Sequence, residues 1–95
     1  MLSLPENITC GYCDCSEFGN LEISPKRKVT KYEFEFYLED RKTTTTDNNV
    51  YSIKKDYIQI AKPGQIRFSE LPFRTAYLKF NVDGDIAEKI ESLPE

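Results

Sequence analysis

The clearest pattern along the chain is a run of alternating apolar and polar side chains over residues 29–40. Successive side chains of a β-strand point to opposite faces, so this alternation predicts a half-buried strand. One face carries Tyr32, Phe34, Phe36 and Leu38, and the other carries Glu33, Glu35, Tyr37 and Glu39. A shift of one residue in strand pairing exchanges the two sets, so the pattern leaves open which face lies inside the domain.

Short runs rich in aromatic and β-branched residues predict further strands in the rest of the chain. These runs cover residues 8–15, 43–46, 51–53, 57–61, 66–69 and 73–82. Turn residues separate several of them, namely Asp47-Asn48-Asn49, Lys54-Lys55-Asp56 and Pro63-Gly64. Because parallel neighbours need a connection of about a dozen residues or more, these short links predict a largely antiparallel sheet. Residues 43–53 are expected to form a hairpin.

Two other local features follow from turn and helix chemistry. Pro63 presets φ and Gly64 accepts a positive φ, so this pair predicts a type II turn, beside which Lys62 is expected to be solvated. At the end of the chain, Ile86, Ile90 and Leu93 recur with a helical period. Asp83 or Asp85 can serve as the N-cap, and Pro94 ends the predicted helix over 83–93. A helix this short must dock on the β-domain or on a partner subunit.

The second half of the chain resembles a known family. The shared features are Tyr51-x-Ile53, Asp56, Ile58-x-Ile60-x-x-Pro63-Gly64, Arg67, Pro72-Phe73 and a closing strand that ends in Lys79-Phe80. This succession resembles the cupin-type sensor domain of AraC-family transcription regulators. The resemblance implies a small antiparallel barrel of the double-stranded β-helix or jelly-roll type, which binds an effector and dimerises in the bacterial cytoplasm.

Composition agrees with a single mainly β domain over residues 1–95, filled by six Phe and six Tyr without any Trp. The apolar runs are too short for a transmembrane helix, and residues 1–5 lack the pattern of a signal peptide, which predicts a cytoplasmic protein without membrane contact. The net charge is −3, and the one dense basic cluster, Lys26-Arg27-Lys28 with Lys31, is expected to be a solvated loop. Because no helix-turn-helix pattern is present, a regulator would contact DNA through a domain outside these residues.

The absence of His argues against an enzyme. Metal-dependent cupins hold their ion with His and a carboxylate, but Arg67 stands where the resembling family has its His after Pro-Gly. Cys10, Cys13 and Cys15 form C-x2-C-x-C, yet there is no fourth Cys, and the three sulfurs diverge on a strand. They are expected to be small buried or half-buried thiols. The sequence predicts no catalytic residue, no metal and no cofactor.

Arg67 is the leading candidate for ligand binding. It shares a strand face with Ser69, and in the resembling domains its position looks into the barrel. A guanidinium there suits a carboxylate, a phosphate or sugar hydroxyls. The alternative is a surface strand Arg paired with Glu70 or Glu35. Further candidate ligand-binding residues are Gln65, Tyr77, Tyr37 and Glu35.

Three functions remain open on the sequence. The favoured one is the effector-binding and dimerisation domain of an AraC-type regulator, which takes a small polar or anionic metabolite, for example a sugar, in a metal-free barrel. Such a domain would be a homodimer, and its effector would change how residues 1–8 or the helix over 83–93 pack against a neighbour. The alternatives are a ligand-free β-barrel assembly module and a stand-alone cupin enzyme.

Overall fold

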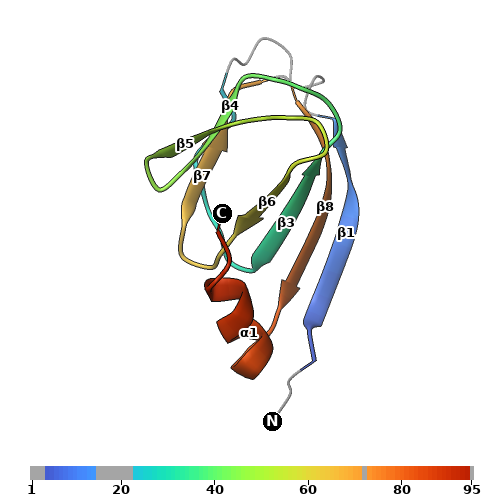
Figure 1. The fold of residues 1–95 in the computed structure, drawn as a ribbon, viewed down its shortest axis with the longest axis vertical. Helices are drawn as coiled ribbons and strands as arrows, with labels where there is room; N and C mark the ends of the chain where they lie inside the picture. Colours follow the sequence, from blue (N-terminus) through green and yellow to red (C-terminus); the bar gives the residue numbers. More distant parts are fainter. Residues whose placement is uncertain (1–3, 15–22, 72, 95) are drawn as a thin grey trace.

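The computed structural model describes residues 4–14, 23–71 and 73–94, which form a mainly β domain with two sheets and one short helix (Figure 1). Both sheets are antiparallel and four-stranded, with the orders β1-β8-β3-β6 and β2-β7-β4-β5. The elements are β1 (Glu6–Asp14), β2 (Arg27–Lys28), β3 (Tyr32–Tyr37), β4 (Thr43–Thr46), β5 (Asn49–Ser52), β6 (Ile58–Ala61), β7 (Ile66–Ser69), β8 (Arg74–Asn81) and α1 (Gly84–Glu91).

The described strands follow the path of one long hairpin wound on itself. Strand β1 pairs with β8, β2 with β7, β3 with β6 and β4 with β5, so the β4–β5 turn is the tip of the hairpin. Two further pairings, β3 with β8 and β4 with β7, assemble the two sheets. Among the described strands, the edges of one sheet do not pair with those of the other. The closed barrel that we predicted is therefore not formed by this part of the chain.

The predicted antiparallel strands are confirmed at all six positions where short runs were expected, with ends that differ by a few residues. The hairpin over 43–53 is also confirmed, because β4 and β5 pair across a two-residue turn. Asp47 and Asn48 both have positive φ values, 47° and 73°, as a type I′ hairpin turn requires. The strand predicted over 29–40 is shorter, because regular pairing covers only Tyr32–Tyr37.

The face of β3 that lies between the sheets is the polar one. Glu33, Glu35 and Tyr37 are buried there, although the alternation alone did not decide the direction. The aromatic face of β3 points outward, where Tyr32 and Phe34 pack under α1 and Phe36 is exposed. Residues of the sheet, of α1 and of the link between them complete this outer cluster, namely Ile60, Leu78, Phe80, Val82, Ile86, Ala87 and Ile90. The domain therefore keeps much of its apolar packing on the outside of a sheet.

The turn between β6 and β7 joins the two sheets. Gly64 has the predicted positive φ, 95°, and its N–H donates to the carbonyl of Val29 over 2.8 Å. The N–H of Gln65 closes the turn on the carbonyl of Lys62 over 3.2 Å. Because β7 starts two residues after Gly64, this turn sets where Arg67 enters the space between the sheets.

Helix α1 is shorter than predicted and docks through fewer residues. Ile90 is buried and Ile86 is half-buried, but Leu93 lies beyond the helix and is 43% exposed. Burying one such side chain contributes about 1.5–3 kcal/mol. Lys62 lies in the turn as expected, and its exposed Nζ also donates to the carbonyls of Glu91 and Leu93 over 2.8 and 3.1 Å, a contact with α1 that the sequence did not predict.

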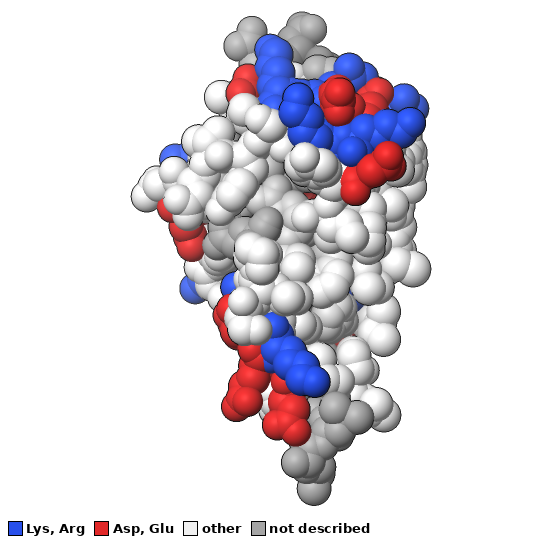
Figure 2. Space-filling model, viewed as in Figure 1, with Lys and Arg blue, Asp and Glu red and all other residues white. Residues whose placement is uncertain are grey.

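Charged side chains gather toward the two ends of the face shown in Figure 2, and the middle of that face is uncharged. The helix lies toward one of these ends (Figure 1). Within the described ranges α1 has only eight residues, and no helix there could span a bilayer.

We predict that Gly64→Ala lowers the free energy of unfolding by about 1–2 kcal/mol, because an L-residue with a side chain is strained at positive φ. No atom lies within 4 Å of the added Cβ, so the cost comes from the backbone and not from a clash. Gly64→Asn is the matched control, since Asn tolerates positive φ, and we expect it to lose less. Urea unfolding measures both variants; equal losses would contradict this account of the turn.

We predict that Lys62→Met loosens α1, because it removes a cation and two hydrogen bonds from the carboxyl end of the helix. Interactions of this kind contribute about 0.3–1 kcal/mol. Amide hydrogen exchange should become several-fold faster in α1 and stay unchanged in β3. Lys55→Met, in an exposed turn, is the control and should leave the exchange of α1 as it is.

Candidate functional site: a charged network between the sheets

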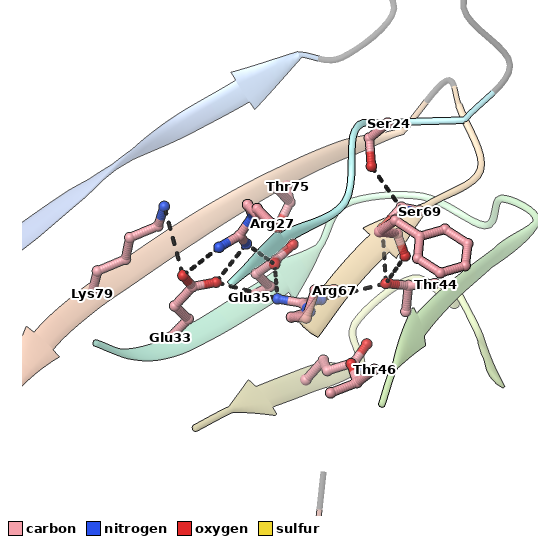
Figure 3. A network of polar contacts seen from close by, with 12 residues as sticks. Ser24, Arg27, Glu33, Glu35, Thr44, Thr46, Arg67, Ser69, Thr75 and Lys79 are labelled. Carbon is pink, nitrogen blue, oxygen red and sulfur yellow. Dashed lines mark hydrogen bonds and ion pairs between the residues drawn. The ribbon is translucent and has the colours of Figure 1, made fainter. Parts of the chain in front are cut away.

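The two sheets meet through charged and hydroxyl side chains (Figure 3). Glu33 and Glu35 come from β3, Arg67 and Ser69 from β7, and Thr44 from β4. Glu33 and Glu35 are two positions apart on β3, as are Arg67 and Ser69 on β7, and Thr44 stands opposite Ser69 in the register. Side chains two positions apart point to the same face of a strand, so all five lie on the inner faces of the sheets. All five are buried. The space between the sheets therefore has a polar centre.

Arg67 is the centre of this network. Its Nη1 donates to the carboxylate of Glu35 and lies 3.4 Å from Oε1 of Glu33. Its Nη2 lies 3.4 Å from Oγ1 of Thr44. The Nε is buried and has no hydrogen-bond partner among the described residues. The side chain is only 3% exposed, so its positive charge depends on Glu35 and Glu33 rather than on water.

Arg27 extends the network to the surface. Its two terminal nitrogens donate to the two carboxylate oxygens of Glu33, each over 2.6 Å, and its Nη2 lies 3.9 Å from Glu35. The Nζ of Lys79 lies 3.9 Å from Glu33 on the other side. Arg27 belongs to β2, which pairs with β7, so the solvated loop that we predicted here is wrong for Arg27 and Lys28. Two buried carboxylates thus face three cations.

The charge of Glu33 is stabilised by its neighbours. Burial raises the pKa of this carboxyl, but the hydrogen bond and the charge of Arg27, helped by Lys79 and Arg67, lower it by more. The net result is a pKa below the ordinary value of Glu. Glu33 therefore stays ionised although its side chain is only 4% exposed.

A second branch of the network consists of neutral groups. Ser69 donates its hydroxyl to Oγ1 of Thr44 over 2.8 Å, and Tyr37 donates to Oε1 of Gln59 over the same distance. Burial, with the nearby charge of Glu35, raises the pKa of Tyr37 to about 12. This tyrosine is therefore a neutral hydrogen-bond donor at physiological pH.

A cavity of about 600 Å³ adjoins the network. This volume falls in the range of small-molecule sites, about 300–1,000 Å³. Its walls combine charged, hydroxyl, thiol and aromatic residues: Tyr12, Cys13, Asp14, Ser24, Pro25, Arg27, Glu35, Arg67, Phe68, Ser69, Phe73, Thr75, Tyr77 and Lys79. Both sheets contribute, so the cavity depends on how the sheets are held together.

Three of the five residues predicted for ligand binding, Arg67, Glu35 and Tyr77, line this cavity. A Cβ at Gly11 would stand 2.8 Å from the hydroxyl oxygen of Tyr77, so the glycine leaves the room that this side chain needs. Tyr37 is buried beside the network and does not line the cavity. Gln65 lies in the β6–β7 turn, where its side-chain oxygen accepts from the N–H of Lys62 over 2.8 Å.

The alternative interpretation of Arg67, a surface residue paired with Glu70 or Glu35, is correct only for its pairing with Glu35. Arg67 does pair with Glu35, but it is buried and not a surface residue. Glu70 is not its partner and accepts a hydrogen bond from the hydroxyl of Thr43.

Our sequence reasoning missed several residues of the site, namely Arg27, Glu33, Thr44, Thr75 and Lys79. Glu33 could have been found, since it stands two residues before Glu35 on one strand face. Thr44 lies in the all-Thr run of β4, so the sequence there does not indicate which side chains point inward. Arg27 reaches the site because β2 pairs with β7, and no local sequence pattern predicts this pairing.

The cysteines take different positions. Cys10 pairs with Leu78 and is exposed, whereas Cys13 pairs with Thr75 and packs against an inner apolar cluster. The different positions agree with the predicted divergence of the sulfurs, but the expectation of a buried or half-buried thiol is wrong for Cys10. Cys15 lies outside the described residues. Within the described ranges, no group of three or more Cys, Asp or Glu side chains is placed to hold a metal ion.

Comparison with known proteins adds no identification: a scan against models of protein families, a search of curated proteins and a search of solved structures each found no match.

The network predicts how stability depends on pH. The pKa of Glu33 is lower in the folded chain than its unfolded value of about 4.3. Its ionised carboxylate therefore makes its full contribution to the free energy of unfolding at pH values above that unfolded value. The contribution is lost as the pH falls through the folded pKa. We expect the urea midpoint of the wild type to fall between pH 5 and pH 3, and Glu33→Gln to show a shallower fall from a lower starting stability. Glu6→Gln, on exposed β1, is the control for charge removal; a slope unchanged in Glu33→Gln would contradict the prediction.

Proposed function

We propose that this chain is a metal-free binding domain whose small polar ligand occupies the cavity between the sheets. The observation that carries the proposal is the buried Arg67, ion-paired with Glu35 on the cavity wall. Buried ion pairs are often no more stabilising than apolar packing of the same volume, so stability alone does not account for them. A cavity with a few convergent polar groups is the usual form of a small-molecule site.

We further propose that the fold is a double-stranded β-helix of the jelly-roll type. The support is the pairing of β1 with β8, β2 with β7, β3 with β6 and β4 with β5, distributed over two four-stranded sheets. Eight antiparallel strands in two sheets characterise jelly rolls, the class that includes the cupins.

The biological role that we propose is that of the effector-binding and dimerisation domain of an AraC-type transcription regulator in the cytoplasm. The support is the resemblance over residues 51–80, in which Arg67 takes the place of a family His, together with the presence of Arg67 on the cavity wall. In this role the domain forms a homodimer, binds its effector without transforming it, and contacts DNA only through another domain.

A second candidate is an assembly module, which one feature favours. On the outer face of the β1-β8-β3-β6 sheet, Phe36 stands between Ala76 and Ile58 in register, and Ile58 is 53% exposed. An apolar row beside α1 is a surface on which another chain could pack. A stable dimer with no response to any small molecule would favour this candidate.

Ligand binding is tested by following the thermal midpoint of the purified chain against a panel of sugars, organic acids and signalling metabolites. A compound that binds only the folded state raises the midpoint by mass action. For a compound that does so, we predict that Tyr77→Phe weakens binding about tenfold, equivalent to about 1.4 kcal/mol, because it removes a hydroxyl from the cavity wall.

Tyr57→Phe is the matched control, since Tyr57 is 65% exposed and does not line the cavity. It should bind as the wild type does. A panel without any effect, or equal binding by Tyr77→Phe and wild type, would count against a ligand site in this cavity.

A further inference from the structure

We infer that Glu35 is a specificity-determining residue: a built-in counter-ion that occupies Arg67 and makes the cavity select uncharged ligands over anions. The inference rests on the proposed function, since it concerns the ligand of the same cavity. It narrows the polar or anionic metabolite expected from the sequence to an uncharged compound with several hydroxyl or carbonyl oxygens.

The guanidinium groups at the cavity are already engaged by carboxylates of the chain. A carboxylate or phosphate ligand is usually held by two parallel N–H donors of an Arg. Arg27 already directs both of its terminal nitrogens to Glu33 over 2.6 Å. Arg67 directs Nη1 to Glu35 and Nη2 toward Thr44. A ligand anion that took both terminal nitrogens of either Arg would therefore have to displace a carboxylate of the chain itself.

The charges around the cavity also disfavour an anion. Three cations, Arg27, Arg67 and Lys79, line the cavity with the carboxylates Glu35 and Asp14, and a third carboxylate, Glu33, pairs with all three cations from behind the wall. A further anion here would meet like charges in a partly dehydrated space, where their repulsion is larger than in water. An uncharged ligand does not meet this repulsion.

The polar groups that remain for a ligand are mainly hydroxyls. The Nε of Arg67 has no partner among the described residues, but it is fully buried and therefore does not offer a ligand anion a second donor beside Nη2. The hydroxyls of Ser69, Thr75 and Tyr77 belong to the same cavity and can accept hydrogen bonds. Single donors and acceptors of this kind match an uncharged polar compound.

The test uses Glu35→Gln, which keeps the shape of the side chain and removes its charge. Sodium acetate and sodium phosphate at millimolar concentrations are the probes, with sodium chloride matched in ionic strength as the reference. We expect both anions to bind Glu35→Gln at least tenfold more tightly than the wild type, seen as a rise in its thermal midpoint above the chloride reference. The wild type should show no such rise.

Glu39→Gln is the matched control, because Glu39 pairs with Arg74 on the surface, away from the cavity. It should not gain anion binding. Glu33→Gln is a second variant in case Glu35→Gln does not fold: it frees the terminal nitrogens of half-exposed Arg27 and should also gain affinity for acetate and phosphate.

Wild type stabilised by acetate or phosphate would overturn the inference, as would folded variants of Glu35 and Glu33 that gain nothing. The same holds if the best wild-type ligand in the metabolite panel carries a carboxylate or phosphate, although the proposed binding function would then stand. A panel without any ligand would count against the proposed function alone, because the acetate and phosphate measurements do not depend on knowing the natural ligand.

Discussion

The ion pair between Arg67 and Glu35 is the interaction on which this domain depends. Arg67 comes from the β2-β7-β4-β5 sheet and Glu35 from the other, so the pair joins the two sheets at their centre. Removing one partner of a buried ion pair typically costs about 3–5 kcal/mol, because the other charge remains in a poorly solvated place. Glu33 and Arg27 enclose this pair and extend it to solvent, so the sheets are held by a connected set of charges.

Because charged and hydroxyl groups occupy the centre of the space between the sheets, part of the apolar packing lies outside that space. One apolar cluster, Tyr37, Ile53, Leu71 and Phe73, lies apart from the second, which forms on the outer face of a sheet. In the outer cluster, Ile90 of α1 covers Tyr32 and Phe80. An eight-residue helix is marginal on its own, so α1 depends on this docking, and the aromatic face of the sheet in turn depends on α1 for its cover. The helix is therefore part of the fold and not an appendage.

Local chemistry made most of the fold predictable, and long-range pairing explains what was missed. Gly64 and the Asp47-Asn48 pair specify their turns within a few residues, so these elements were predicted correctly. The alternation around Glu35 showed a strand but not its inner face, because that choice depends on Arg67, which follows 32 residues later. Arg67 was found through its position in a motif. Arg27 was not found, because its two-residue strand is stabilised only by pairing with β7.

The turn between β6 and β7 connects the docked helix with the charged network between the sheets. On one side of Gly64, Lys62 holds the carboxyl end of α1, and on the other side Arg67 stands in the charged network. Lys62, which anchors the helix, and Arg67, at the centre of the cavity wall, are therefore only five positions apart in the sequence. Because Gly64 and Gln65 also exchange hydrogen bonds with Val29, in the link between β2 and β3, the position of the turn is fixed by a second connection between the sheets. A ligand at Arg67 can alter the packing of α1 only to the extent that it binds one arrangement of this turn better than another.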